Sequence, residues 1–136
     1  MDNEEERRDR NEANIAWLQE TFDAAKSQNS AGVMLVMQAN IFEGDTAQPS
    51  GFAEFRDALR RETIAFGKPV VLDHGDSHFF RIDKPLYTEE GSRVLNFTLV
   101  ETFGDKDVHW VRSTVDTRAP EVFYFRSEIV EENVTP

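Results

Sequence analysis

Two short apolar runs, Val33-Met34-Leu35-Val36-Met37 and Val70-Val71-Leu72, decide the fold. Neither run alternates apolar with polar residues, and such a pattern is typical of strands that are covered on both faces in a parallel sheet. The segment between them follows helical spacing, with apolar or small side chains at Phe52, Phe55, Leu59, Thr63 and Phe66. The order strand, helix, strand predicts that the two strands are parallel neighbours joined by a crossover helix.

An earlier helix is predicted to begin at Asn11 and to end near Gln28. Its apolar stripe is formed by Ile15, Leu18, Phe22 and Ala25. Residues 1–12 carry six acidic and three basic side chains, so we expect them to form a charged, flexible leader. For the second helix, Ser50 is the expected N-cap residue, and Gly67 followed by Pro69 is expected to end it.

The rest of the chain is rich in aromatic and β-branched residues, which favours strands. Four strands are expected, at residues 79–82, 94–103, 108–115 and 122–129, and their short spacing favours an antiparallel meander. The predicted fold class is therefore α/β, a strand-helix-strand parallel unit followed by an antiparallel meander. We expect one domain over residues 13–130 and a tail over 131–136, with Trp17, Trp110 and the phenylalanines in the core.

Composition narrows the classes of function. The chain has 136 residues, a formal net charge of −11 and no cysteine. The negative charge opposes the phosphates of nucleic acids, and the lack of cysteine excludes disulfides and zinc-thiolate sites. No run approaches the roughly 20 apolar residues of a membrane-spanning helix, and no apolar segment of an export signal follows Met1. We therefore expect no nucleic-acid or membrane partner and a cytoplasmic location for the chain as given, whereas an upstream export signal would leave the compartment open.

Two histidines and two carboxylates follow the second strand directly, within Asp73-His74-Gly75-Asp76-Ser77-His78. The carboxyl ends of parallel strands share one crevice, so we expect residues 38–40 and 73–78 to face a common cleft. Imidazole and carboxylate groups suit Zn, Mn or Fe. The same string is also typical of a tight turn, in which Asp and Ser bond nearby backbone groups. Both interpretations remain open on the residues alone.

A family resemblance adds to this pattern. The string Gly75-Asp76-Ser77-His78 resembles the Gly-His-x-His terminal motif of the calcineurin-like metallophosphoesterases, with Asp76 in place of the first histidine. The segment 33–40 resembles the strand that ends in a metal-ligating histidine in that family, and here Gln38 holds that position. The likeness extends to residues 108–112, and the chain resembles an uncharacterised bacterial branch of the family.

The resemblance implies the C-terminal half of a metallophosphoesterase-like α/β sandwich. Nothing in this sequence matches the family's opening Asp-x-His on a first strand, its Gly-Asp-x-x-Asp or its Gly-Asn-His motif, since the Asp-x-His strings at residues 76–78 and 107–109 lack the required second aspartate motif downstream. We therefore expect a phosphoester hydrolase that is inactive or incomplete alone, either a fragment or a natural truncation. The implied metal ligands are His78, Asp76 and Gln38, for a divalent ion such as Mn, Zn or Fe, and no catalytic residue is assigned. We expect Asn40, His74 and Arg81 to contact the substrate.

Two further expectations concern charge pairing and assembly. Arg81 and Lys84 are suited to receive a phosphate or to pair with Asp83 and Asp73. A half-sandwich leaves an apolar sheet face uncovered, which predicts a homo-oligomer or a complex with a missing N-terminal half. The alternative function is a non-catalytic oligomerising or small-ligand-binding module.

Overall fold

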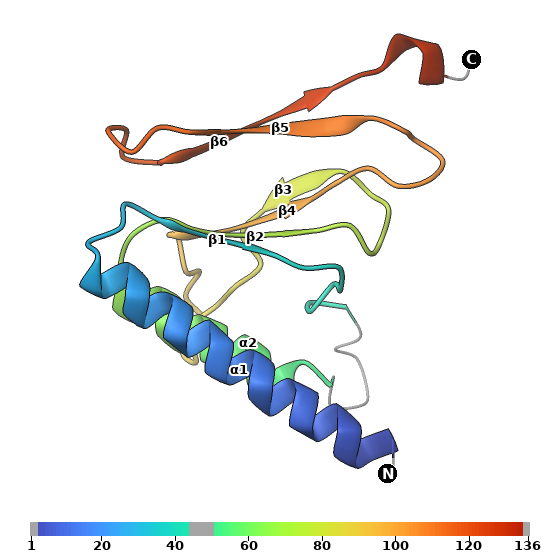
Figure 1. Cartoon of the computed structure of the whole chain (residues 1–136). Helices are drawn as coiled ribbons and strands as arrows, with labels where there is room; N and C mark the ends of the chain where they lie inside the picture. Colours follow the sequence, from blue (N-terminus) through green and yellow to red (C-terminus); the bar gives the residue numbers. More distant parts are fainter. Residues whose placement is uncertain (1–2, 44–50, 135–136) are drawn as a thin grey trace.

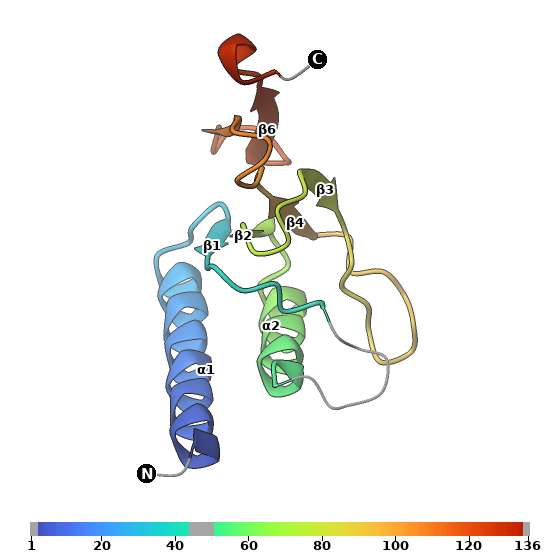
Figure 2. The same ribbon diagram turned by 90° about the vertical axis from the view of Figure 1, so that its right-hand side faces the viewer.

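The chain folds into three layers, as the computed structural model in Figures 1 and 2 shows. The structure describes residues 3–43 and 51–134. Two helices lie beneath a four-stranded sheet, and a two-stranded hairpin lies above it. The predicted α/β fold class is confirmed. None of the helices in the described ranges is long and apolar enough to cross a membrane.

Helix α1 (Asn3–Ser27) begins well before the predicted start at Asn11. Residues 3–10 are exposed, as expected of a charged segment, but residues 3–12 are helical rather than a flexible leader. Three glutamates, Glu4 to Glu6, occupy the first turn, where the helix dipole favours negative charge. Ion pairs one turn apart, such as Arg8 with Glu12, add further support.

Helix α2 (Ala53–Phe66) lies beside α1 on the same face of the sheet. The predicted N-cap residue, Ser50, lies outside the described residues, and the N-cap position in the structure is Phe52. At the other end, Gly67 takes the left-handed conformation with φ of 68°, and its N–H bonds the Thr63 carbonyl. The predicted stop at Gly67 is therefore confirmed, because glycine adopts positive φ without steric cost.

The central sheet has the strand order β1-β2-β4-β3. Strands β1 (Val33–Val36) and β2 (Val70–His74) are parallel, which confirms the predicted crossover unit. The antiparallel meander is only partly correct. Strand β4 (Phe97–Glu101) pairs with β2 in parallel, and β3 (Arg81–Asp83) pairs with β4 in an antiparallel manner at the sheet edge. The long connection between β3 and β4 lets the more apolar strand take the buried central position.

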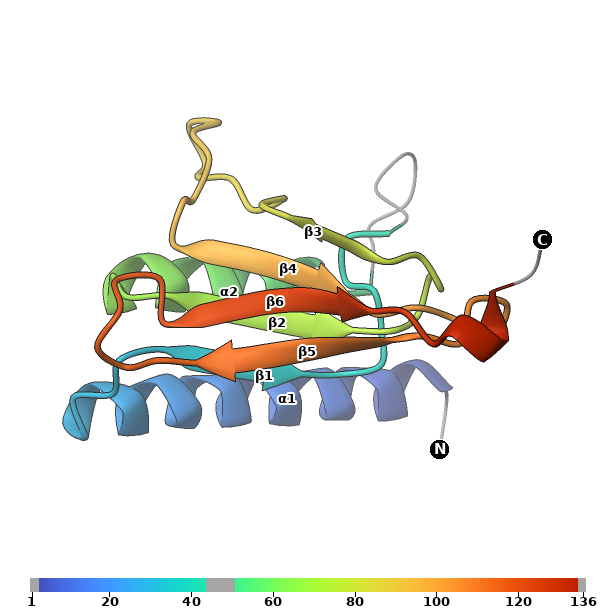
Figure 3. The same ribbon diagram turned by 90° about the horizontal axis from the view of Figure 1, so that it is seen from above.

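Strands β5 (Trp110–Val115) and β6 (Phe123–Glu128) form the antiparallel hairpin, and a short 3-10 helix, η1 (Glu131–Asn133), follows. Seen from above, the hairpin lies over β1 and β2 (Figure 3). At its base, His109 Nδ1 accepts a hydrogen bond of 3.1 Å from the Val130 N–H, so this histidine is packed against the end of β6.

The main core lies between the helices and the sheet. Its fully buried residues come from both helices and from the central sheet, and they include Leu18, Phe22, Leu59, Leu72, Phe97 and Leu99. Two tryptophans were expected there but are exposed, Trp17 by 62% and Trp110 by 49%. Trp17 is one position off the buried stripe of α1, and Trp110 lies on the hairpin with the Arg112 guanidinium 5.3 Å above its ring.

Candidate functional site

The carboxyl ends of three parallel strands lie along one edge of the sheet. Val36 of β1 is paired with Asp73 of β2, and His74 is paired with Glu101 of β4. The antiparallel strand β3 starts at the same edge, where Arg81 is paired with Glu101. The loops after β1 and β2 therefore lie side by side, as the parallel order predicted.

Hydrogen bonds tie these two loops together. The backbone N–H of Asn40 donates to Asp76 Oδ2 at 3.0 Å, and its side-chain amide donates to Ser77 Oγ at 2.8 Å. The Asn40 side-chain oxygen accepts from the Phe42 N–H at 3.0 Å. Asn40 is only 7% exposed, so it links the loops from below. The same bonds are those expected of a turn-shaping cluster.

His78 stands above this linkage with its side chain 52% exposed. Its φ is 59°, an uncommon conformation for a residue with a side chain, and such conformations are concentrated at functional sites. Its Nδ1 lies 3.2 Å from Asp105 Oδ1. Gly104 packs so closely against His78 that an added Cβ would overlap the histidine side chain and lie 2.7 Å from its Cα. The loop after β4 therefore holds His78 in place.

A row of three ionisable side chains lies below the loops, formed by His74, Glu101 and Arg81. His74 and Glu101 are buried, with exposures of 2% and 0%. Glu101 Oε2 lies 3.8 Å from His74 Nε2 and 3.2 Å from Arg81 Nε. Within the described residues, none of these three atoms has a partner in good hydrogen-bond geometry. Burying a carboxylate without a partner costs free energy. The burial of Glu101 therefore depends on the neighbouring Arg81 and His74 side chains, which are cationic or can donate a proton.

This row supports the loop above it. The Asp76 N–H donates to His74 Nδ1 at 3.4 Å, and the Phe79 N–H donates to Glu101 Oε1 at 3.5 Å. Both bonds are long and therefore weak. His74 itself is buried beneath this loop. Its role in substrate binding, like that of Asn40, stays a prediction.

The expected pairing of the basic residues is wrong. Arg81 lies against Glu101, not against Asp83 or Asp73. Lys84 Nζ donates to the carbonyls of Leu95 and Phe97 and to the Thr98 hydroxyl. Both differences involve β4 and the residues just before it, because Arg81 is paired with Glu101 across the two strands and Lys84 reaches Phe97 and Thr98.

Asp73 itself contributes to the electrostatics of this edge. Burial raises the pKa of its carboxyl group, because desolvation disfavours the charged form, while the neighbouring His74 acts in the opposite direction. Ionisation of Asp73 is therefore less favourable in the folded protein than in water.

A complete metal site is not assembled by the described residues. No three His, Asp or Glu side chains in that part of the chain lie close enough together to hold one ion. His78 has Asp105 beside it, Asp76 is engaged by Asn40, and Gln38 is exposed on the loop after β1. These donors do not make a closed site by themselves, and the metal and the role of Gln38 remain predictions.

Two carboxylates at this edge were missed by sequence reasoning. Glu101 is the only charged residue of the strand segment 97–101, whose other members are apolar apart from Thr98, and this is a usable signal of a buried functional or paired carboxylate. Asp105 follows Gly104 in a turn, and its sequence context gives no signal that it meets His78.

Comparisons with protein-family models, with curated proteins and with solved structures found no match for this chain.

Proposed function

We propose that this chain carries part of a metal-dependent phosphoesterase centre at the carboxyl edge of its sheet. The supporting observation is the linkage of Asn40 with Asp76 and Ser77, which brings the loops after β1 and β2 to one place. His78 and Asp76 are the proposed metal-binding residues, with Gln38 as a weaker third contact. Imidazole and carboxylate donors favour Mn, Zn or Fe. The resemblance of residues 75–78 to the metallophosphoesterase terminal motif points the same way.

The proposed centre is incomplete within this chain. Two-metal hydrolysis requires a bridging carboxylate between ions about 3.5–4 Å apart. The described residues offer a histidine with one carboxylate beside it, at 3.2 Å between His78 and Asp105, but not a third ligand. We therefore derive no hydrolytic step for the chain alone, and we propose that a missing N-terminal half or a second copy supplies the remaining ligands.

Substrate contact is proposed for Arg81. Its side chain is 35% exposed while its Nε lies 3.2 Å from the buried Glu101 carboxylate. This pairing fixes one side of the guanidinium and leaves part of it accessible, and a planar guanidinium suits a phosphate oxygen pair. Asn40 and His74 are proposed to act with Arg81, chiefly by holding the loop that carries His78.

The partner is proposed to dock at the β1 edge. Strand β1 is the outer strand of the sheet, so one row of its backbone groups faces away from β2. Beside it, Val36 is 69% and Trp17 62% exposed. A groove of about 280 Å³ lies between α1 and β1, and Leu35, Met37 and Phe55 also line it. Exposed apolar surface next to a free strand edge favours association with another chain.

A second candidate function is a non-catalytic oligomerising or small-ligand-binding module. It is favoured by the bonds from Asn40 to Asp76 and Ser77, which shape a turn without any metal. In that case Asp76 and Ser77 only organise the loop, and the β1 edge carries the function.

A hydrolysis assay combined with sedimentation separates these candidates. Wild-type chain and His78→Ala would be assayed with Mn²⁺ against bis(p-nitrophenyl) phosphate, while sedimentation velocity at micromolar concentration reports assembly. We expect weak, metal-dependent turnover only in an assembled species, and its loss in His78→Ala. A compact monomer without turnover would refute completion by a second copy. An assembled species without turnover would favour the non-catalytic module.

A further inference from the structure

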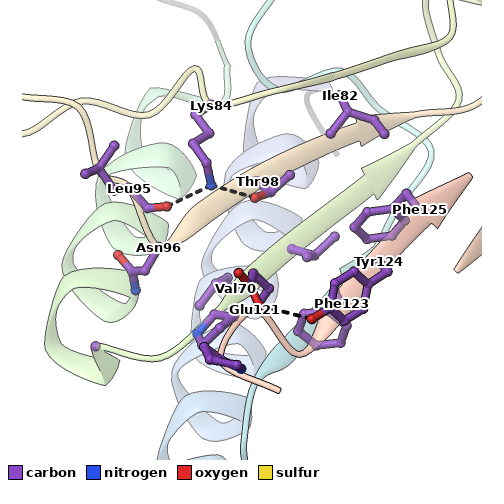
Figure 4. Close-up of a pocket in the computed structure, with 14 residues that line it drawn as sticks. Val70, Ile82, Lys84, Leu95, Asn96, Thr98, Glu121, Phe123, Tyr124 and Phe125 are labelled. Carbon is purple, nitrogen blue, oxygen red and sulfur yellow. Dashed lines mark hydrogen bonds between the residues drawn. The ribbon is translucent and has the colours of Figure 1, made fainter. Parts of the chain in front are cut away.

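A groove of about 680 Å³ lies between β6 and the central sheet, away from the carboxyl edge. Val71 of β2, Thr98 of β4 and Ile82 of β3 line its sheet side, and Phe123 and Phe125 of β6 line its hairpin side (Figure 4). The volume is within the range of about 300–1,000 Å³ that is typical of small-molecule sites. The groove is thus large enough for a ligand and is separate from the proposed phosphoesterase edge.

The walls of this groove are mainly apolar, and some of the side chains are poorly covered. Ile82 is 44% and Leu95 70% exposed. Phe123 is held firmly, since its ring approaches Gly32 so closely that a Cβ there would lie 2.6 Å from Cε2. A flexible apolar molecule would cover Ile82 against a fixed aromatic wall, and removing this area from water favours binding.

A positive charge lies at one end of the groove. Lys84 Nζ donates to the Leu95 carbonyl at 2.7 Å, to the Phe97 carbonyl at 3.1 Å and to Thr98 Oγ1 at 2.9 Å. These acceptors are neutral, and no carboxylate of the described residues pairs with this ammonium. Burial lowers the pKa of Lys84, as expected of a cation without a counter-ion. Since Thr98 Oγ1 accepts from Lys84, its own hydroxyl proton remains free to be donated.

The opposite end of the groove carries a negative charge. Glu121 accepts a hydrogen bond of 3.0 Å from the Tyr124 hydroxyl, and Figure 4 places Glu121 and Lys84 well apart. An anionic head group would be attracted toward Lys84 and repelled from Glu121, so the groove selects both the sign of the charge and the orientation of the ligand.

We propose that this groove binds a small amphipathic carboxylate, such as a medium-chain fatty acid. Its apolar chain lies along Ile82, Val71 and Phe125, and its carboxylate lies near the Thr98 hydroxyl and the Lys84 charge. This site is independent of the carboxyl edge, and it is a function that the proposed phosphoesterase centre does not require.

The test uses octanoate, decanoate and dodecanoate below their micellar concentrations, with dodecyltrimethylammonium as the cation of matched length. Calorimetry measures affinity and stoichiometry, and amide chemical shifts locate the site. We expect one saturable site per chain, with affinity rising by up to about fourfold for each added methylene. The cation should bind at least about tenfold more weakly than dodecanoate, and the largest shifts should surround Ile82 and Phe125.

Variants of the wall and of the charge complete the experiment. Lys84→Met keeps the apolar stem and should weaken dodecanoate binding about tenfold, whereas Lys106→Met, on an exposed loop, should leave it unchanged. If Lys84→Met fails to fold, Ile82→Asp on the exposed sheet edge serves instead and should abolish binding. Equal affinity for the anion and the cation, shifts centred on Trp17, or the absence of saturable binding would each overturn the proposal.

Discussion

Replacing Gly104 with alanine should disturb the candidate site specifically, because the new methyl group has no free space. An added Cβ at Gly104 would overlap the Cβ and Cγ of His78 and would lie 2.7 Å from its Cα. A side-chain rotation of His78 cannot relieve this contact, since its Cα and Cβ are fixed to the backbone. One of the two loops must therefore move. The backbone of His78 is already in an uncommon conformation, since its φ is positive.

The expected cost follows from this geometry. Overpacking of well-packed sites typically costs about 1–3 kcal/mol, and the involvement of a backbone atom places Gly104→Ala toward the upper end. A loss of about 2–3 kcal/mol in a domain of this size lowers the Tm by about 6–12 °C. Circular dichroism melts would measure the shift. Gly51→Ala is the matched control, because nothing lies within 4 Å of its added Cβ, and its Tm should stay within about 2 °C of wild type.

The double variant Gly104→Ala with His78→Gly tests the cause. Removing the His78 side chain eliminates the overlap with its Cβ and Cγ and permits the positive φ, so the double variant should recover most of the lost stability. If Gly104→Ala melts like Gly51→Ala, or if His78→Gly does not rescue it, the close packing of the two loops is not a property of the folded protein.

Three further predictions concern stability. Glu101→Ala should lower the free energy of unfolding in urea by about 2–3 kcal/mol. Breaking a fully buried ion pair costs roughly 3–5 kcal/mol, but here Arg81 is partly exposed, so the loss is smaller. An unchanged urea midpoint would contradict the pairing of Glu101 with Arg81. Asp73→Asn should stabilise the protein at neutral pH, because burial raises the pKa of Asp73 in the folded state and its ionisation is therefore unfavourable there. The advantage should shrink as the pH falls toward the unfolded-state pKa of about 3.9, and a pH-independent difference would be inconsistent with it. Gly67→Ala should cost about 1–2 kcal/mol in thermal melts through its φ of 68° alone, since nothing crowds an added Cβ; a neutral effect would argue against the left-handed cap.

The parallel unit could be predicted because its two strands are uninterrupted apolar runs at residues 33–37 and 70–72, and because Gly67 marks the helix end. The position of β4 could not, since short spacing in the sequence favoured a meander while burial of its apolar residues placed it next to β2. Trp17 was misplaced for a related reason, because aromatic character alone does not tell on which side of a helix a residue lies.

The candidate site, like the fold, could be predicted from the sequence only in part. The meeting of Asn40 with Asp76 agrees with the parallel strand order, from which the sequence predicted that residues 38–40 and 73–78 face a common cleft. Glu101 and Asp105 were missed because both lie at or beyond the end of β4, so their proximity to His74 and His78 depends on a strand order that the sequence did not reveal.

The most direct test of the proposed metal-binding edge is a calorimetric titration of metal-free protein with Mn²⁺ and Zn²⁺. Wild type, His78→Ala and Asp107→Ala would be compared in one buffer, because Asp107 is an exposed carboxylate of the same loop as Asp105. We expect saturable binding in wild type and in Asp107→Ala and none in His78→Ala. Binding that is absent from all three proteins, or equal in all three, would contradict it.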